Sequence, residues 1–362
     1  MGGSFLGRIL KISTFGESHG ESVGVVIDGC PAGLEIYKWE IEEYLKRRSP
    51  VSKFSTARIE PDNLKILSGI MENKTLGTPI CICVDNKNFN SSDYDELKEV
   101  FRPGHADYTY EKKFGIRDYR GGGRASGRET VARVIAGCIA KKFLSELGID
   151  IQTYTFSINN ICINKIDCDA QKNFLFMPDS TTFEKTVDFL ENNLKNDSVG
   201  GIVECKINNI KAGIGEPVFD KLDAQIAKAV MSIGAVKGIE FGNGFDCTYL
   251  FGSQNNDQYY FDDVVKKKSN NSGGIVGGIT DGGQIIFRAA IKPTPSISKL
   301  QSTITKSNEN VQIKINGRHD KLIVPRAVVV IESMAALALM DQILLSCTCK
   351  LESVKKNYLE RG

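Results

Sequence analysis

Hydrophobic residues recur along this chain with two different periods, and these periods separate the predicted strands from the predicted helices. Strand-like runs, several with strict alternation, lie at residues 9–14, 23–27, 64–70, 79–84, 151–158, 201–207 and 284–290. Helical spacing predicts helices at residues 38–48, 126–147, 181–193, 218–233 and 326–345. Because strands and helices do not alternate one for one, the pattern favours a layered α+β fold over a doubly wound parallel sheet.

The helix predicted to begin after Ser126 carries the strongest signal. Residues 126–129 read Ser-Gly-Arg-Glu, a capping-box pattern in which the serine and the glutamate satisfy N–H groups of the first turn. Gly148 is placed to end this helix. The apolar residues that line one face are Val131, Val134, Ile135, Cys138 and Ile139.

The longest apolar stretch, residues 327–340, is interrupted by Glu332 and Ser333. It falls short of the about 18 apolar residues that a membrane span needs, so we expect a buried helix. The N-terminus lacks the pattern of an export signal, and Leu6 stands where a myristoylation signal has Ser or Thr.

The composition fits a globular protein, since 41% of the 362 residues are hydrophobic, and without a linker or repeat we expect one domain over residues 1–362. Lys and Arg number 46 against 44 Asp and Glu, and this net charge of +2 argues against a protein that coats nucleic acid or an anionic membrane. The ten cysteines are scattered, and the C-x-C pairs at 81/83 and 347/349 lack histidines at zinc-finger spacing. We therefore expect reduced thiols in a cytoplasm, and no metal site.

Three histidines are the candidates for acid–base chemistry, because imidazole titrates near neutrality. A single histidine is more often structural, but here each one lies in a short polar segment with glycine and charged neighbours. They are His19 in residues 16–20, His105 in residues 102–107 and His319 in residues 317–320.

Arginines gather in the segment that leads into the helix after Ser126. Residues 102–133 hold six arginines against four acidic residues. The loop 120–124, Arg-Gly-Gly-Gly-Arg, places guanidinium groups beside the free N–H groups of a helix start, so it predicts an anion site. For Arg117 and Arg133 we instead expect pairing with neighbouring carboxylates.

Two further segments could contact ligands. The basic cluster Lys46-Arg47-Arg48, with Lys53 and Arg58, follows a predicted helix. The glycine-rich segment 272–278 precedes residues 292–296. Neither this segment nor the glycine-rich loop 120–124 has the spacing of a dinucleotide fingerprint or a nucleoside-triphosphate loop. A nucleotide-like cofactor would therefore bind outside those folds.

On six motifs the chain resembles the chorismate synthase family over nearly its whole length. The motifs are TFGESHG at 14–20, FRPGHADYTY at 101–110, DYRGGGR at 118–124, GEPVFDKLDA at 215–224, AVKG at 235–238 and GRHD at 317–320. The chain departs from the family pattern at Lys53, Gly127, Gly234 and Lys321, and residues 50–52 lack a glycine.

The resemblance implies a lyase that eliminates phosphate from 5-enolpyruvylshikimate 3-phosphate to give chorismate, in the shikimate pathway of aromatic amino-acid biosynthesis. It implies reduced FMN (FMNH2) as a required cofactor although the reaction has no net redox change, and it associates the chain with NADP. The implied fold is a β-α-β sandwich with antiparallel sheets enclosed by helices. The implied assembly is a cytoplasmic homotetramer that binds neither nucleic acid nor membrane.

The resemblance also implies roles for single residues. His105, flanked by Arg102 and Asp107, is our candidate to protonate the leaving phosphate, His19 sets the protonation state of the flavin with support from Ser18, and Asp320 acts with the flavin N5 on the ring proton. We expect a structural role for His319. The substrate-binding residues are Ser18, Arg48, Lys53, Arg102 and Arg128. The flavin-binding residues are Arg124, Ala125, Ser126, Gly234, Ala235, Gly277, Lys292, Pro293, Thr294, Pro295, Ser296 and Arg318.

Two other classes of function stay open at this point. The interleaved tyrosine and arginines of residues 119–124 suggest an RNA-binding protein, although RNA binders usually show a broad basic face. A flavoprotein oxidoreductase would need a hydride-donor site and would consume reductant stoichiometrically. Flavin affinity with and without the enolpyruvyl substrate separates the three classes.

Overall fold

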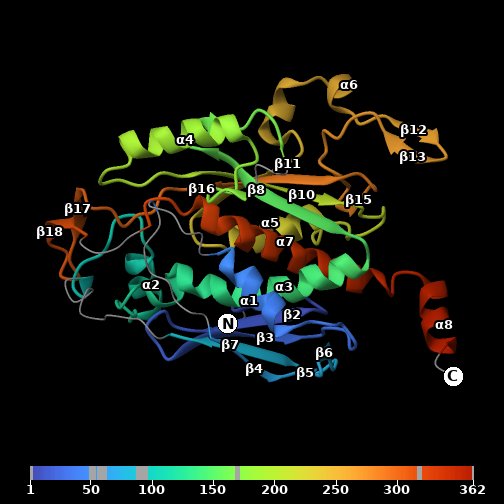
Figure 1. Ribbon diagram of the computed structural model, residues 1–362, viewed down its shortest axis with the longest axis horizontal. Helices are drawn as coiled ribbons and strands as arrows, with labels where there is room; N and C mark the ends of the chain where they lie inside the picture. The colour runs from blue at the N-terminus through green and yellow to red at the C-terminus, as the bar shows by residue number, and fades with distance from the viewer. Residues whose placement is uncertain are drawn as a thin grey trace.

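Two five-stranded antiparallel sheets enclose a layer of helices in the computed structural model (Figure 1). The structure describes residues 3–48, 54, 63–86, 97–167, 172–315 and 320–360. The strand order is β1-β2-β3-β7-β4 in the first sheet and β11-β16-β10-β8-β9 in the second. This arrangement confirms the expected β-α-β sandwich.

The first sheet is built from strands whose apolar residues alternate. Its members are β1 (Phe5–Leu6), β2 (Lys11–Gly16), β3 (Ser22–Asp28), β4 (Leu64–Ser68) and β7 (Ile80–Asp85). Val23, Val25 and Ile27 of the central strand β3 are buried, because their common face packs on the helical layer. The turn between β2 and β3 holds residues 17–21, which include the first histidine motif.

The second sheet lies on the other side of the helices. Its members are β8 (Asp150–Ile158), β9 (Ile161–Cys162), β10 (Gly201–Asn208), β11 (Val236–Phe241) and β16 (Ile285–Ile291). Val203, Cys205 and Ile207 of β10 and Phe287 of β16 are fully buried, and the sheet faces α5 and α7. The predicted strands therefore form in both sheets with ends shifted by one or two residues.

Four helices make up the layer between the sheets. They are α1 (Lys38–Lys46), α3 (Thr130–Glu146), α5 (Leu222–Met231) and α7 (Val324–Ser346). Helices α3 and α7 approach closely at Gly137, where a Cβ atom would lie 2.1 Å from the Cβ of Ser333. A side chain at this position would therefore push the two central helices apart.

The other elements lie around the sandwich. The helix α4 (Ser180–Asn193) lies on the outer side of the second sheet, and α8 (Leu351–Leu359) projects from the body near the C-terminus (Figure 1). The remaining helices are α2 (Asp107–Phe114), α6 (Gly252–Asn255) and the 3-10 helices η2 (Gly123–Ala125), η3 (Gly127–Glu129) and η5 (Gly244–Tyr249). The hairpins are β5–β6 (Ile70–Met71, Lys74–Thr75), β12–β13 (Tyr259–Asp262, Val264–Lys267), β14–β15 (Ile275–Val276, Ile279–Thr280) and β17–β18 (Leu300–Ile304, Asn310–Lys314).

Half of the predicted capping box at Ser126 forms. The Ser126 hydroxyl accepts the N–H of Arg128 at 3.3 Å, but the first turn is 3-10 rather than α-helical. The reciprocal contact was predicted wrongly, because Glu129 bonds to Thr14 and Arg133 instead of reaching back. Gly148 follows the end of α3 with a positive φ of 74°, as expected of a residue that ends a helix.

Helix α7 contains the apolar stretch that we expected to be buried. By length and composition it is the one helix among the described residues that could cross a membrane, but 89% of its most apolar window is buried inside the fold. The expectation of a buried core helix is confirmed. The polar interruption at Glu332 is satisfied internally, by hydrogen bonds from Tyr44, Arg47 and Lys141.

Candidate functional site

A basic cleft of about 1200 Å³ opens beside the start of α3. Its walls come from the N-terminal residues, the loop 102–106, the loop 121–130, the α5–β11 connection, residues 292–296 and the start of α7. The charged residues on these walls are Arg48, Arg102, Lys113, Arg124, Arg128, Glu129, Arg133, Lys228, Lys237, Lys292, Asp320 and Arg326. Ten cationic side chains against two carboxylates make the cleft strongly basic in a nearly neutral protein, and Arg124 of the loop predicted to bind an anion is among them.

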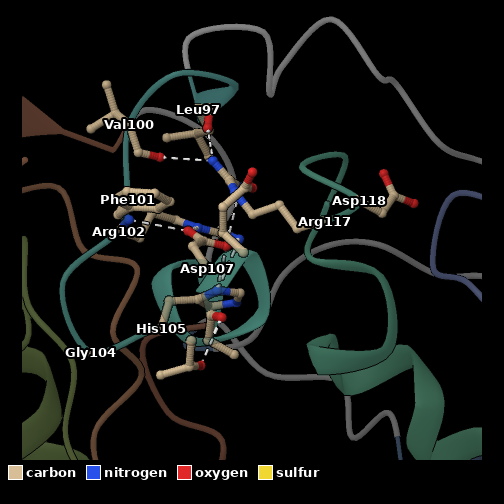
Figure 2. Close-up of polar contacts among 12 residues, drawn as sticks. Leu97, Val100, Phe101, Arg102, Gly104, His105, Asp107, Arg117 and Asp118 are labelled. Carbon is tan, nitrogen blue, oxygen red and sulfur yellow. Dashed lines mark hydrogen bonds and ion pairs between the residues drawn. The ribbon is translucent and has the colours of Figure 1, made fainter. Parts of the chain in front are cut away.

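His105 lies on the wall of this cleft within a buried ionic cluster (Figure 2). Its Nδ1 lies 2.8 Å from Oδ1 of Asp107. Arg102 donates to the same carboxylate from Nε at 2.7 Å and from Nη2 at 2.9 Å. Burial alone would raise the pKa of Asp107, but the hydrogen bonds and charges of Arg102 and His105 hold it well below its usual range.

Arg117 supports this cluster from behind and does not line the cleft. Its guanidinium donates to the carbonyl groups of Leu97 at 2.7 Å and Val100 at 3.1 Å. It also lies 3.5 Å from Asp107 and 3.4 Å from Glu111. The expected pairing of Arg117 with carboxylates is confirmed, as is that of Arg133, whose Nε lies 2.8 Å from Glu129.

The loop Gly121–Gly123 lies directly on the residues of two histidine motifs. A Cβ atom at Gly121 would lie 2.6 Å from Nε2 of His19 and 3.1 Å from the hydroxyl of Ser18, and a Cβ at Gly122 would lie 2.9 Å from Cε1 of His105. Both glycines have positive φ, which also disfavours a side chain. Ser18 and His19 are buried behind Gly121, and it is Gly121 that lines the cleft.

The predicted anion-binding arginines converge on the cleft from different elements. Arg128 donates from Nε to Asn86 at 2.9 Å, and the buried Arg48 follows α1. Arg124 donates to the carbonyl groups of Thr14 and Gly16, each at 3.1 Å, so it ties the loop 120–124 to β2.

Asp320 also lines the cleft, where Arg326 holds it. The Nη1 of Arg326 donates to the Asp320 carboxylate, and its Nε donates to the carbonyl of Arg48 at 3.2 Å. Sequence reasoning missed Arg326, since a lone basic residue at the start of an apolar helix carries no site signal. It also missed Lys113 near the end of α2 and Lys228 near the end of α5, and it did not single out Lys237 within the motif at 235–238.

Most of the predicted flavin-binding residues line one part of the cleft. They are Arg124, Ala125, Ser126, Gly234, Ala235, Lys292, Thr294, Pro295 and Ser296. Pro293 lies between two lining residues, whereas Gly277 lies in the turn between β14 and β15 and does not line the cleft. Lys53, Arg318 and His319 fall outside the described residues, so their predicted roles stay predictions.

A flat cofactor fits this part of the cleft. A Cβ atom added at Gly127 or at Gly234 would have nothing within 4 Å, so there is open space beside the backbone at each of these two glycines. Lys292, Lys237 and Arg133 are cationic residues of the cleft wall, although Arg133 is also paired with Glu129. Among the residues the structure describes, no group of three His, Cys, Asp or Glu side chains could hold a metal ion.

Comparisons with known proteins agree on one family. The family model described as chorismate synthase matches residues 10–344. A chorismate synthase from Lachnoclostridium phytofermentans is 55% identical and covers 99% of this chain and 100% of its own, and one from Lachnospira eligens is 54% identical with the same coverage. A crystal structure of a chorismate synthase superimposes with a TM-score of 0.74 at 31% identity, over 98% of this chain and 97% of that one. The chain belongs to the chorismate synthase family.

Proposed function

We propose that the basic cleft is the site at which this chain carries out the reaction of its family. That reaction is the 1,4-elimination of phosphate from 5-enolpyruvylshikimate 3-phosphate, which gives chorismate and makes the chain a lyase of the shikimate pathway. The observation that carries the assignment to the cleft is its charge: ten cationic side chains and two carboxylates. The substrate brings a phosphate and two carboxylates, and FMN brings a second phosphate, so a cleft for both needs this excess of cations.

The residues that would hold reduced FMN are those around Gly127 and Gly234, where the backbone is open to a flat ring. Ala125, Ser126, Ala235 and the segment 292–296 complete the proposed flavin site. When bound, reduced FMN supplies an electron-rich ring to a reaction that has no net redox change. Arg318, Pro293 and Gly277 stay part of this proposal through the family resemblance, as does NADP.

For the substrate, we propose that Arg48 and Arg128 bind anionic groups directly. Both are buried, so each contact is made in a poorly solvated environment where a charge-assisted hydrogen bond is strong. Arg102 already donates two hydrogen bonds to Asp107. Its contribution therefore comes through its positive charge and through N–H groups that Asp107 does not take. Lys53 and Ser18 complete the proposed set.

Proton transfer is divided among three residues in this proposal. His105 lines the cleft beside Arg102 and donates a proton to the leaving phosphate. His19 lies behind Gly121, within reach of one end of the cleft, and sets the charge of the flavin. The Asp320 carboxylate, oriented by Arg326, takes part in removal of the ring proton.

A homotetramer is supported by an aromatic arm, which we define as residues 244–267. It comprises η5, α6, β12 and β13 and extends from the second sheet (Figure 1). Phe251 and Phe261 are each 78% exposed, and monomeric proteins seldom leave such residues clustered on the surface. We propose that the arm packs against other copies of the chain in a cytoplasmic tetramer. Sedimentation as a monomer at micromolar concentration would contradict this.

The single domain over residues 1–362 also remains our proposal. The first sheet packs mainly on α3 and the second on α5 and α7, while α3 and α7 pack on each other, so the buried residues form one continuous core.

Replacing Arg48 tests the assignment of the cleft. Arg48→Met removes a buried cation from the proposed substrate site, whereas Lys46→Met removes an exposed cation two residues earlier. Loss of a buried contact to an anion costs about 2–5 kcal/mol, so kcat/KM for Arg48→Met should fall by about 30-fold to several thousand-fold. Lys46→Met should leave kcat/KM unchanged. Equal kinetics for Arg48→Met and the wild type would remove Arg48 from the site.

A further inference from the structure

We propose that Asp107 is the positioning residue of His105, because its carboxylate accepts the Nδ1–H of the imidazole and thereby directs Nε2 into the cleft. Arg102 and Arg117 hold that carboxylate in place. The inference rests on the proposed function, since it concerns the histidine that we assign to the leaving phosphate.

The contacts around Asp107 leave its carboxylate little freedom to move. Oδ2 accepts hydrogen bonds from the backbone N–H of Arg102 at 3.1 Å and from its Nε at 2.7 Å, and Oδ1 accepts from its Nη2 at 2.9 Å. The side chains of Asp107 and Arg117 are each only 2% exposed. Asp107 is also the first residue of α2, where the helix dipole favours a negative charge. The imidazole therefore meets a fixed acceptor (Figure 2).

This geometry selects one tautomer of His105. Nδ1 lies 2.8 Å from Oδ1 of Asp107 and 3.1 Å from Nη2 of Arg102. A guanidinium group can only donate, and Nη2 already donates to Oδ1. If Nδ1 carried no proton, its lone pair would face a carboxylate oxygen at hydrogen-bond distance. With a proton on Nδ1, every close contact in the cluster pairs a donor with an acceptor, except that between Nη2 and Nδ1.

The selected tautomer leaves Nε2 as the nitrogen that gains and loses a proton. This edge of the ring faces Gly122, where an added Cβ would lie 3.2 Å from Nε2. Gly122 thus lets the backbone approach the imidazole without covering it with a side chain. Because His105 lines the cleft, Nε2 is the atom that would donate to a phosphate bound there.

Asp107 also balances the positive charges around His105. Arg102 lies on the same loop, Arg117 follows α2, and Lys292 approaches from the segment 292–296, where its Nζ donates to the carbonyl of Gly104 at 2.6 Å. These cations oppose the charged form of an imidazole, and Asp107 is the carboxylate in direct contact with it. Because Asp107 stays ionised at any working pH, it stabilises the imidazolium by charge and does not take its proton.

The sharpest test is the tautomer of His105, which can be measured without any mutation. The chain has three histidines, so 15N spectra of histidine-labelled protein contain few signals to assign. We expect neutral His105 to carry its proton on Nδ1 in the wild type. A wild-type His105 protonated on Nε2 would overturn the inference whether or not any variant folds.

Asp107→Asn is the matching substitution. The amide oxygen should occupy the position of Oδ2, where two donors of Arg102 meet it, and the amide NH2 then faces Nδ1 and stabilises the opposite tautomer. We expect the 15N signals of His105 to report this switch. With saturating reduced FMN, the single-turnover rate should fall by about 10²–10⁴-fold while the affinity for reduced FMN is unchanged.

Two further variants separate this inference from the proposed function. Glu111→Gln removes another carboxylate beside Arg117 that does not touch His105, and it should leave the rate and the tautomer unchanged. In a His105→Ala background, Asp107→Asn should add little to the loss of rate, because Asp107 acts through the imidazole. Full activity of His105→Ala would refute the proposed role of that histidine. Full activity of Asp107→Asn beside an inactive His105→Ala would refute only the inference about Asp107.

Discussion

Glu332→Gln should destabilise the fold at neutral pH. It should also make the free energy of unfolding less sensitive to acid. Glu332 lies in the middle of α7 with its side chain 1% exposed. It accepts hydrogen bonds from the Tyr44 hydroxyl at 2.9 Å, from Arg47 at 2.7 Å and 2.9 Å, and from Lys141 at 2.6 Å. These contacts join α1, α3 and α7, and Arg47 precedes the cleft residue Arg48. The neutral amide keeps the shape of the side chain but removes the charge that two cations face.

The size of the effect follows from the pKa of Glu332. Burial would raise it, but the charges and hydrogen bonds of Arg47 and Lys141 lower it from 4.5 to about 2. At about 1.4 kcal/mol per unit, this difference corresponds to about 3 kcal/mol of stability. Removal of one partner from a buried ion pair typically costs about 3–5 kcal/mol, which agrees in size. With an unfolding entropy of about 2.1 cal/mol/K per residue, the melting temperature should fall by about 4 °C.

The stabilisation that Glu332 provides should decrease as the pH falls. Because the pKa is lower in the folded state, Glu332 contributes its full stability above about pH 4.5 and loses it as the pH falls toward about 2. Urea unfolding of the wild type and the variant should therefore differ by about 3 kcal/mol at pH 7, and by progressively less below pH 4.5. Glu43→Gln, an exposed change on α1, is the control. A difference under about 1 kcal/mol at pH 7, or one that stays constant with pH, would refute the reasoning.

The remaining predictions concern close approach and capping. Gly122→Ala should displace the ring of His105, and Gly121→Ala should displace that of His19, since the added Cβ would lie 2.9 Å and 2.6 Å from the respective rings. In 15N spectra each variant should shift the signals of its own histidine, and a variant that shifts both would contradict the assignment. Asp341→Ala should cost about 1–3 kcal/mol and speed hydrogen exchange of the backbone amides of residues 8–10, which its carboxylate accepts at 2.8–2.9 Å. Unchanged exchange would show that this carboxylate does not hold the N-terminal segment.

The sequence predicted seven of the ten strands of the two sheets and all four helices between them, because these elements bury an apolar face, but it missed the short strands β1 and β9 and the edge strand β11. Val23, Val25 and Ile27 alternate along β3, and this pattern survives in the structure as a buried stripe. Helix α2 was missed because its residues are mainly polar and half exposed, so no apolar face marks it. The β12–β13 hairpin was missed for a different reason: its residues are mainly apolar, but nearly all of them are exposed, so no alternation of buried and exposed positions marks the strands.

The site was predictable as a set of motifs but not as a network. The motifs placed His105 and the arginines near one anion site, and the cleft brings most of them together. Nothing in the sequence shows that the Arg102 side chain donates two hydrogen bonds to Asp107, because this contact depends on the backbone turn between the two residues. The partnership of Arg326 with Asp320 depends on how α7 meets the preceding loop, which a one-dimensional pattern does not contain.

The most direct test of the central claim is the stoichiometry of the reaction under anaerobic conditions. The purified chain is supplied with 5-enolpyruvylshikimate 3-phosphate and a catalytic amount of reduced FMN, and chorismate, phosphate and the redox state of the flavin are followed together. We predict one chorismate and one phosphate for each substrate consumed, over many turnovers, with the flavin still reduced at the end and no turnover with oxidised FMN. Consumption of reductant in proportion to product, or chorismate formation without flavin, would contradict the account.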